Sequence, residues 1–228
     1  MTAAAAAMPP DPLPAPAAVV AHYAAGVEEQ QRMMQGASME VEIQASLPKL
    51  KKHGRLQALR RISRLGRITY EAIRFEGDNT VKSNVIARYL TADAQAQAQG
   101  APSLAVTPEN YKFKYKGMLE CGSEAVHIFQ VIPRHKKPGF FKGEVWVDAH
   151  TFLRVRESGQ FVKSPSIFLK KIQFVRDYEI HDGISVPRQT HTVVDTRIVG
   201  PAELTIDFRN VSFAEGLKRA SLVDVGDQ

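Results

Sequence analysis

Residues 141–161 read Phe141-Lys-Gly-Glu-Val-Trp-Val-Asp148-Ala-His-Thr-Phe-Leu-Arg-Val-Arg156-Glu-Ser-Gly-Gln-Phe161. Successive side chains of a β-strand point to opposite faces, so Val145 and Val147 share one face and Trp146 lies on the other. Asp148 favours a turn, because an aspartate side chain can accept hydrogen bonds from backbone amides just after it. The pattern therefore predicts an antiparallel hairpin, and no catalytic group stands out within it.

The same alternation recurs along the chain. It predicts strands at residues 39–45, 68–75, 81–90, 111–116, 125–132, 172–180, 184–194 and 202–208, most of them joined by short turns. The hairpin and the basic segment 49–67 raise the total to about ten or eleven strands, and consecutive antiparallel strands of that number must curl or close. The predicted fold class is mainly β (α+β), a strongly curved, unclosed antiparallel β-barrel.

Other segments depart from this alternation. Residues 18–35 have a helical apolar face that includes Val19 and Tyr23, with Gly36 as a plausible end of the helix. Residues 91–102 and 164–169 are expected to form loops or short helices that act as a lid. The basic segment 49–67 favours strands, with Gly54 and Gly66 as bracketing turns, although its leucine spacing also fits a helix.

Composition limits the class of protein. The chain has 228 residues, of which 44% are hydrophobic, and a formal net charge of +6. We expect an Ala/Pro-rich disordered leader at 1–17 and a single domain at 18–228. The positive charge favours anionic partners, and the lone Cys121 excludes an intramolecular disulfide. The leader fits either the remnant of a processed signal peptide or the N-terminus of a cytoplasmic protein.

The chain lacks the usual signatures of enzymes and metal sites. It contains no GxSxG, HExxH, P-loop or GxGxxG motif, and no histidine pair at metal-ligand spacing. No enzyme activity, cofactor or metal is therefore predicted. The basic segment carries no aromatic side chain for base stacking, which argues against nucleic acid as a partner.

Two sets of residues are candidates for binding. Aromatic and aliphatic side chains that share strand faces are predicted to line an apolar cavity or, alternatively, to fill an ordinary core: Tyr111, Phe113, Tyr115, Trp146, Phe174, Tyr178, Leu204, Ile206 and Phe208. Basic and aromatic residues are predicted to form a surface that contacts an anionic membrane or a partner protein: Lys51, Lys52, Arg60, Arg61, Lys136, Lys137, Phe140 and Phe141. The alternatives are a solvated outer strand face in the basic segment and a hairpin tip whose phenylalanines belong to the core.

Residues 111–213 resemble the bacterial outer-membrane lipoprotein-sorting carriers, the LolA/LolB-like superfamily. The resemblance lies in the order of Tyr111–Gly117, Val126–Val131, Phe141–Asp148, Leu153–Arg156, and Tyr178 to the Val186-Pro187 pair. It implies an unclosed half-barrel with a lid, an apolar cavity for acyl chains, a periplasmic location after signal removal, and no catalysis. The basic segment and the leader depart from the family pattern.

The predicted function is a monomeric, non-enzymatic periplasmic carrier of the acyl chains of lipids or lipoproteins. The alternative is an envelope-associated interaction or sensor module on the same fold, which would use its basic surface to bind an envelope protein.

Overall fold

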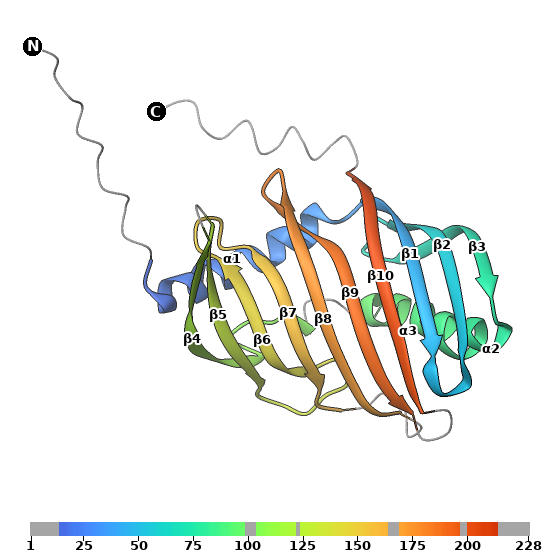
Figure 1. The fold of residues 1–228 in the computed structure, drawn as a ribbon. Coiled ribbons are helices and arrows are strands. Elements are labelled where there is room, and N and C mark those ends of the chain that lie inside the picture. Colours follow the sequence, from blue (N-terminus) through green and yellow to red (C-terminus); the bar gives the residue numbers. More distant parts are fainter. Residues whose placement is uncertain (1–13, 99–103, 122–123, 164–168, 197–199, 214–228) are drawn as a thin grey trace, which may run out of the picture.

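The computed structural model describes residues 14–98, 104–121, 124–163, 169–196 and 200–213. Ten strands form one curved antiparallel sheet that is not closed into a barrel (Figure 1), as predicted. The strands are β1 (Ser38–Leu47), β2 (Lys52–Ile62), β3 (Ile68–Gly77), β4 (Tyr111–Cys121), β5 (Glu124–Pro133), β6 (Phe141–Asp148), β7 (Arg154–Phe161), β8 (Leu169–His181), β9 (Ile184–Thr196) and β10 (Pro201–Ser212).

The order of the strands shows that the first and last strands of the sheet are neighbours. It runs β3-β2-β1-β10-β9-β8-β7-β6-β5-β4, so two up-and-down meanders join where the first strand pairs with the last. In that pairing Ile43 lies opposite Ile206. The segment between β3 and β4 must therefore cross from one edge of the sheet to the other.

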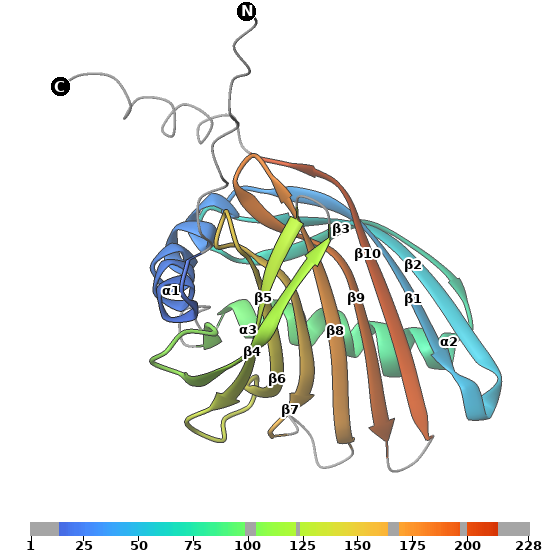
Figure 2. The same ribbon diagram turned by 60° about the vertical axis from the view of Figure 1, so that its left-hand side comes forward.

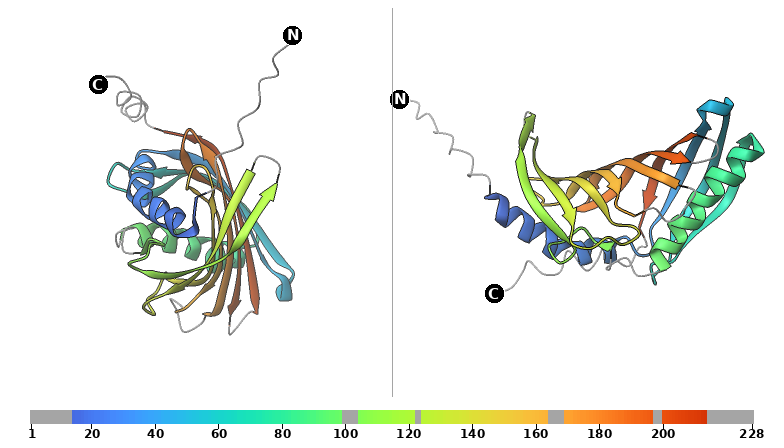
Figure 3. Two further views of the ribbon diagram at one scale, coloured as in Figure 1. Left: turned by 90° about the vertical axis from the view of Figure 1, so that its left-hand side faces the viewer. Right: turned by 90° about the horizontal axis from the view of Figure 1, so that it is seen from below.

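Helices cover one face of the sheet, which we call the inner face. They are α1 (Pro16–Met33) and a continuous segment made of α2 (Asn79–Val81), the π-helical turn η2 (Lys82–Ile86) and α3 (Ala87–Ala98); a short turn, η1 (Pro48–Leu50), links β1 and β2. Both helical segments lie on the same side of the sheet (Figure 3), and the strands curve around α3 (Figure 2). Among the described residues, no helix is both long and apolar enough to cross a membrane.

The predicted strand at 81–90 is wrong, because this segment is helical. Asp78 accepts a hydrogen bond from the amide of Thr80 at 2.7 Å, so it caps a helix rather than shaping a hairpin turn. Val81 and Ile86 are fully buried, and Tyr89 and Leu90 pack against the same cluster. Their spacing follows one face of a helix, a pattern that a short apolar run does not separate from a strand.

The basic segment contains one strand rather than two. Gly66 forms a turn, as expected, but Gly54 lies inside β2 and not at a turn. A Cβ atom at position 54 would lie 3.0 Å from the ring of Phe75 and 3.2 Å from Val81. Gly54 therefore lets β3 and the helical segment pack closely on the inner face.

The hairpin from β6 to β7 is confirmed. Asp148 Oδ1 accepts hydrogen bonds from the amides of His150 and Thr151 at 3.1 and 2.7 Å, and Phe141 lies opposite Phe161. The N-terminal helix is also confirmed as α1. Residues 1–13 of the predicted leader and most of the predicted lid segment 164–169 lie outside the described residues.

Candidate functional site: the inner face and its charged belt

One row of side chains crosses the inner face from edge to edge. The strand register places successive members opposite one another, in the order Tyr115, Phe129, Val145, Glu157, Arg176, Thr190, Ile206, Ile43, Leu56 and Phe75. Both ends of the row are apolar, and Glu157, Arg176 and Thr190 form a polar centre. The inner face is therefore divided into two apolar regions by a charged belt on β7, β8 and β9.

The two apolar regions are separate packed clusters. The cluster near β4 contains Tyr111, Phe129, Val145 and Phe174, and α1 contributes Val19 to it. The cluster near β3 contains residues of β1, β2 and β10, which include Leu204 and Ile206, and the helical segment contributes Val81 and Ile86. Each helical segment thus covers one apolar region of the inner face.

Glu157 is the centre of the charged belt. Only 2% of its surface is exposed, and its carboxylate accepts hydrogen bonds from Arg154 Nη1 at 3.0 Å and from the Tyr178 hydroxyl at 2.9 Å. Arg176 Nη1 lies 3.7 Å from the same carboxylate. A bulge between β6 and β7 brings Arg154 to the same face as Glu157.

Charge pairing keeps Glu157 ionised. Burial alone would raise the pKa of its carboxyl, but Arg154 and Arg176 outweigh that effect and hold the pKa below its usual value. Burial raises the pKa of the Tyr178 phenol to about 12, so this side chain remains a neutral donor. A carboxylate held in its ionised form by two arginines is a poor general acid at neutral pH, and the belt is better suited to binding than to proton transfer.

Helix α1 lies over the belt and the cluster near β4 and is held there by apolar and polar contacts. Val19 and Tyr23 are its buried side chains, and burial also raises the pKa of the Tyr23 phenol beside Arg154. Near the other end of α1, Gln30 Nε2 donates to the carbonyl of Gly183 at 2.9 Å, and its Oε1 accepts from the amide of Ser185 at 2.8 Å. This amide clamp fixes α1 to the turn between β8 and β9.

A second polar contact fixes α3 to β2 and β3. Arg60 Nε lies 3.2 Å from Asp93 Oδ2, which also accepts a hydrogen bond from the Tyr70 hydroxyl at 2.7 Å. Arg60 is only 8% exposed. Its prediction as a surface residue is wrong, because the alternation of β2 places it on the inner face with Leu56 and Ala58.

The predicted apolar set is only partly brought together. Tyr111, Phe113 and Phe174 lie in or against the cluster near β4, whereas Leu204, Ile206 and Phe208 lie in or against the cluster near β3. Tyr178 belongs to the charged belt, and Tyr115 is at the β4 edge with 41% of its surface exposed.

Trp146 is on the opposite face of the sheet, and its prediction as an inner residue is wrong. Val145 and Val147 occupy the inner face of β6, so the residue between them points outward. The guanidinium of Arg156 lies 5.4 Å from the centre of the Trp146 ring, and Arg156 pairs on that outer face with Asp177 at 3.0 Å.

The predicted surface set also divides. Lys51, Arg61, Lys136 and Lys137 are exposed, and Lys52 is half-buried with its ammonium 3.0 Å from Thr80 Oγ1. Phe140 and Phe141 are buried, which contradicts their prediction as surface residues and confirms the alternative that they belong to the core. Their rings pack against Tyr111, with ring centres 5.3 and 5.7 Å apart, and so complete the cluster near β4.

The charged belt was not predicted, although the sequence contains a signal for it. A hairpin in which Phe141 opposes Phe161 necessarily places Glu157 opposite Val145, on the buried face of β6. The carboxylate therefore needed a cationic partner. Which arginine supplies it depends on the β6–β7 bulge and on the β7–β8 register, neither of which is local to the sequence of β7.

His127 is a buried polar side chain on the inner face of β5. It is 3% exposed, lies beside the rings of Tyr115 and Phe129, and neither ring nitrogen has a hydrogen-bond partner within the described part of the chain. Burial lowers the pKa of the imidazole, so the neutral form is favoured in the folded protein.

Replacing His127 by phenylalanine is expected to stabilise the protein by about 1 kcal/mol, because it removes unpaired buried nitrogens at little cost in shape. The gain in stability should increase as the pH falls below 6.5. In the wild type, His127 then binds a proton in the unfolded state but not in the folded state, which destabilises the wild type and not the variant. Urea unfolding at pH 7.5 and 5.5 measures both effects. The exposed His53→Phe is the control, and a loss of stability at both pH values would contradict the prediction.

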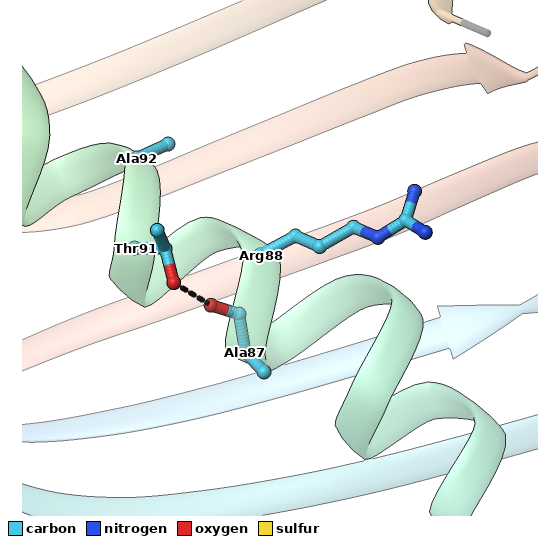
Figure 4. A pocket seen from close by; sticks show the side chains of 4 residues that line it. All are labelled: Ala87, Arg88, Thr91 and Ala92. Atoms are coloured by element: carbon cyan, nitrogen blue, oxygen red, sulfur yellow. Dashed lines mark hydrogen bonds between the residues drawn. The ribbon is translucent and has the colours of Figure 1, made fainter.

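Two pockets in the described part of the chain lie on the surface of α3 and at the border of the cluster near β3. One, of about 260 Å³, is lined by Ala87, Arg88, Thr91 and Ala92 on α3 (Figure 4), where Thr91 donates a hydrogen bond to the carbonyl of Ala87 at 2.9 Å. The other, of about 350 Å³, lies where the chain enters β1, near Gly36 and Arg61. Both are at or below the low end of the usual size for small-molecule sites. Across the described ranges, no group of three potential metal ligands comes together.

Comparisons with known proteins give similarities of fold at low sequence identity. A DUF1329-family protein of Desulfovibrio piger is 16% identical with a TM-score of 0.43, covering 87% of this chain and 94% of that one. An outer-membrane lipoprotein-sorting protein domain of Vibrio parahaemolyticus is 14% identical with a TM-score of 0.42, covering 86% and 93%. A LolA-superfamily protein of Nitrosomonas europaea is 10% identical with a TM-score of 0.39, covering 84% and 94%.

No family model matches the sequence, and no curated protein matches it. The TM-scores of these similar structures are below 0.5, and they carry no inference about function.

Proposed function

We propose that this protein is a non-enzymatic binder and carrier of acyl chains, from lipids or lipoproteins, that works in the periplasm. The observation that carries the proposal is the inner face of the sheet, which is apolar toward both edges and is covered there by two separate helical segments. The resemblance of residues 111–213 to lipoprotein-sorting carriers supports the same proposal.

The energetics of α1 are compatible with its displacement by a ligand. Burying a valine or a comparably large side chain contributes about 1.5–3 kcal/mol. Helix α1 buries Val19 and Tyr23 in full and Val20 and Val27 in part. An acyl chain gains about 0.8 kcal/mol for each methylene that leaves water. A chain of ordinary length can therefore compensate for the inner-face contacts that α1 gives up.

The two pockets, of about 260 and 350 Å³, are too small for an acyl chain, and in the proposed mechanism a helix moves to admit it. The ligand would occupy the surface that a helix vacates, and its chains would contact side chains such as Phe174 or Ile206. Exchange between this apolar surface and a membrane interior changes the environment of the chains little, which allows both uptake and release.

Acyl-chain binding predicts that gently isolated protein carries lipid. Native mass spectrometry should show an added mass in the range of phospholipids or acylated peptides, and delipidated protein should gain thermal stability when either is returned. A delipidated protein that gains no stability from phospholipid or lipopeptide would contradict the proposal.

The amide clamp gives a sharper prediction. Gln30→Ala removes both hydrogen bonds between α1 and the β8–β9 turn, each worth about 1 kcal/mol, so the displaced state should be populated about thirtyfold more. Uptake of a fluorescent fatty acid, followed by stopped flow, should accelerate accordingly. The exposed Gln173→Ala is the matched control, and equal uptake rates in the two variants would exclude α1 as the displaced cover.

A further inference from the structure

The charged belt has more positive than negative charge. Two guanidiniums, of Arg154 and Arg176, approach the single carboxylate of Glu157, which leaves a net charge of +1. The neighbouring phenols of Tyr23 and Tyr178 are neutral. The centre of an otherwise apolar face is thus cationic, and it lies between the two apolar clusters.

Arg176 has unused hydrogen-bonding capacity. Its ion-pair distance of 3.7 Å to Glu157 is beyond hydrogen-bond reach, and within the described ranges its guanidinium makes no hydrogen bond. One face of the guanidinium lies over the ring of Phe174 at 4.6 Å, which leaves the N–H groups at its edge. An arginine normally uses its five N–H donors on carboxylate or phosphate oxygens.

Both arginines are accessible although they lie on the inner face. The side chain of Arg154 is 39% exposed and that of Arg176 is 40% exposed, whereas their shared partner Glu157 is almost completely buried. A ligand can therefore approach the guanidiniums without displacing the carboxylate. Arg176 also lies near Tyr89 of α3, so this position is next to the second helical segment.

We propose that Arg154 and Arg176 bind the anionic head of an amphiphile, a phosphate ester in particular, whose acyl chains extend into the neighbouring apolar regions. This inference rests on the proposed function and specifies its ligand class. A phosphate suits the site because its oxygens accept several N–H bonds at once, and because its negative charge is opposite in sign to the net charge of the belt. A neutral head would leave the donors of Arg176 unused.

Isothermal titration calorimetry with three amphiphiles that share one oleoyl chain tests the inference. Oleoyl lysophosphatidic acid should bind about tenfold more tightly than monooleoylglycerol, and oleoyl lysophosphatidylcholine should lie between them. Inorganic phosphate alone, at millimolar concentration, should give no binding. If phosphate alone bound as tightly as the lysophosphatidic acid, the site would take a free anion and the amphiphile proposal would be overturned.

Arginine variants assign the preference to the belt. Arg176→Gln should reduce the advantage of lysophosphatidic acid over monooleoylglycerol to less than about threefold, and Arg154→Gln should act in the same direction. Arg156→Gln is the matched control, because Arg156 is also 39% exposed and also pairs at 3.0 Å, but on the outer face. It should leave the preference unchanged.

The outcomes separate the two proposals. Binding of all three amphiphiles with equal affinity would overturn the headgroup site and leave the acyl-chain carrier intact. Binding of none of them would overturn the carrier function itself. An equal loss of preference in Arg176→Gln and Arg156→Gln would show that general surface charge, rather than the belt, attracts the anion.

Discussion

Replacing Gly143 by alanine is expected to destabilise the protein by about 3 kcal/mol or more. A Cβ atom at this position would lie 1.9 Å from the carbonyl oxygen of Ser158 and 2.5 Å from the Cα of Gly159. Both atoms belong to the backbone of β7, and β6 is also paired with β5 on its other side. The strands therefore cannot separate without breaking the ladder. Urea unfolding measures the loss.

Gly26→Ala is the matched control, because no atom lies within 4 Å of a Cβ built at this position of α1. Alanine is favoured over glycine inside a helix by about 0.5–1 kcal/mol, so this variant should be slightly more stable than the wild type. A Gly143→Ala variant with the same unfolding midpoint as the wild type would contradict the close approach of β6 and β7.

Replacing Glu157 by glutamine is expected to cost about 2–3 kcal/mol. Loss of one member of a buried charge pair usually costs 3–5 kcal/mol, and the cost is lower here because Arg154 and Arg176 are about two-fifths exposed and keep part of their hydration. Glu71→Gln is the control, since Glu71 pairs with Arg61 at 2.8 Å where both side chains are about half exposed. It should cost less than about 1 kcal/mol. Equal costs for the two variants would contradict a buried charge network.

The same carboxylate predicts how stability depends on pH. The pKa of Glu157 is lowered by folding, so the folded state binds fewer protons than the unfolded state below the ordinary glutamate value of 4.5. The contribution of the ionised Glu157 carboxylate to the free energy of unfolding is complete above that pH. It is lost as the pH falls through the pKa of Glu157 in the folded state. Glu157→Gln should therefore show a shallower loss of stability between pH 4.5 and 3 than the wild type.

Local patterns explain how much of the fold could be predicted. The strands from β4 to β10 followed from alternation and from turn residues such as Asp148, which act over a few residues. Alternation predicts a strand over residues 81–90, which lie in the helical segment at 79–98, because a short apolar run does not distinguish the two periods. The side-chain cap at Asp78 was the signal that favoured the helix.

The site was less predictable than the fold. Alternation separates Trp146 from Val145 and Val147 but does not say which of the two faces is covered by helices. Arg60 shows the same difficulty. An arginine in a basic segment is expected to be exposed, and its burial follows only from the pairing of β2 and from the position of α3, which places Asp93 beside it. Burial depends on partners that are distant in sequence.

The antiparallel strands, the turn at Asp148 and the N-terminal helix follow from the amino-acid sequence, because they depend on interactions between near neighbours. The pairing of β1 with β10, the burial of Phe140 and Phe141, and the approach of Arg154 and Arg176 to Glu157 follow from the folded arrangement. Desolvation and ion pairing act between residues that are distant in sequence and that the fold brings together.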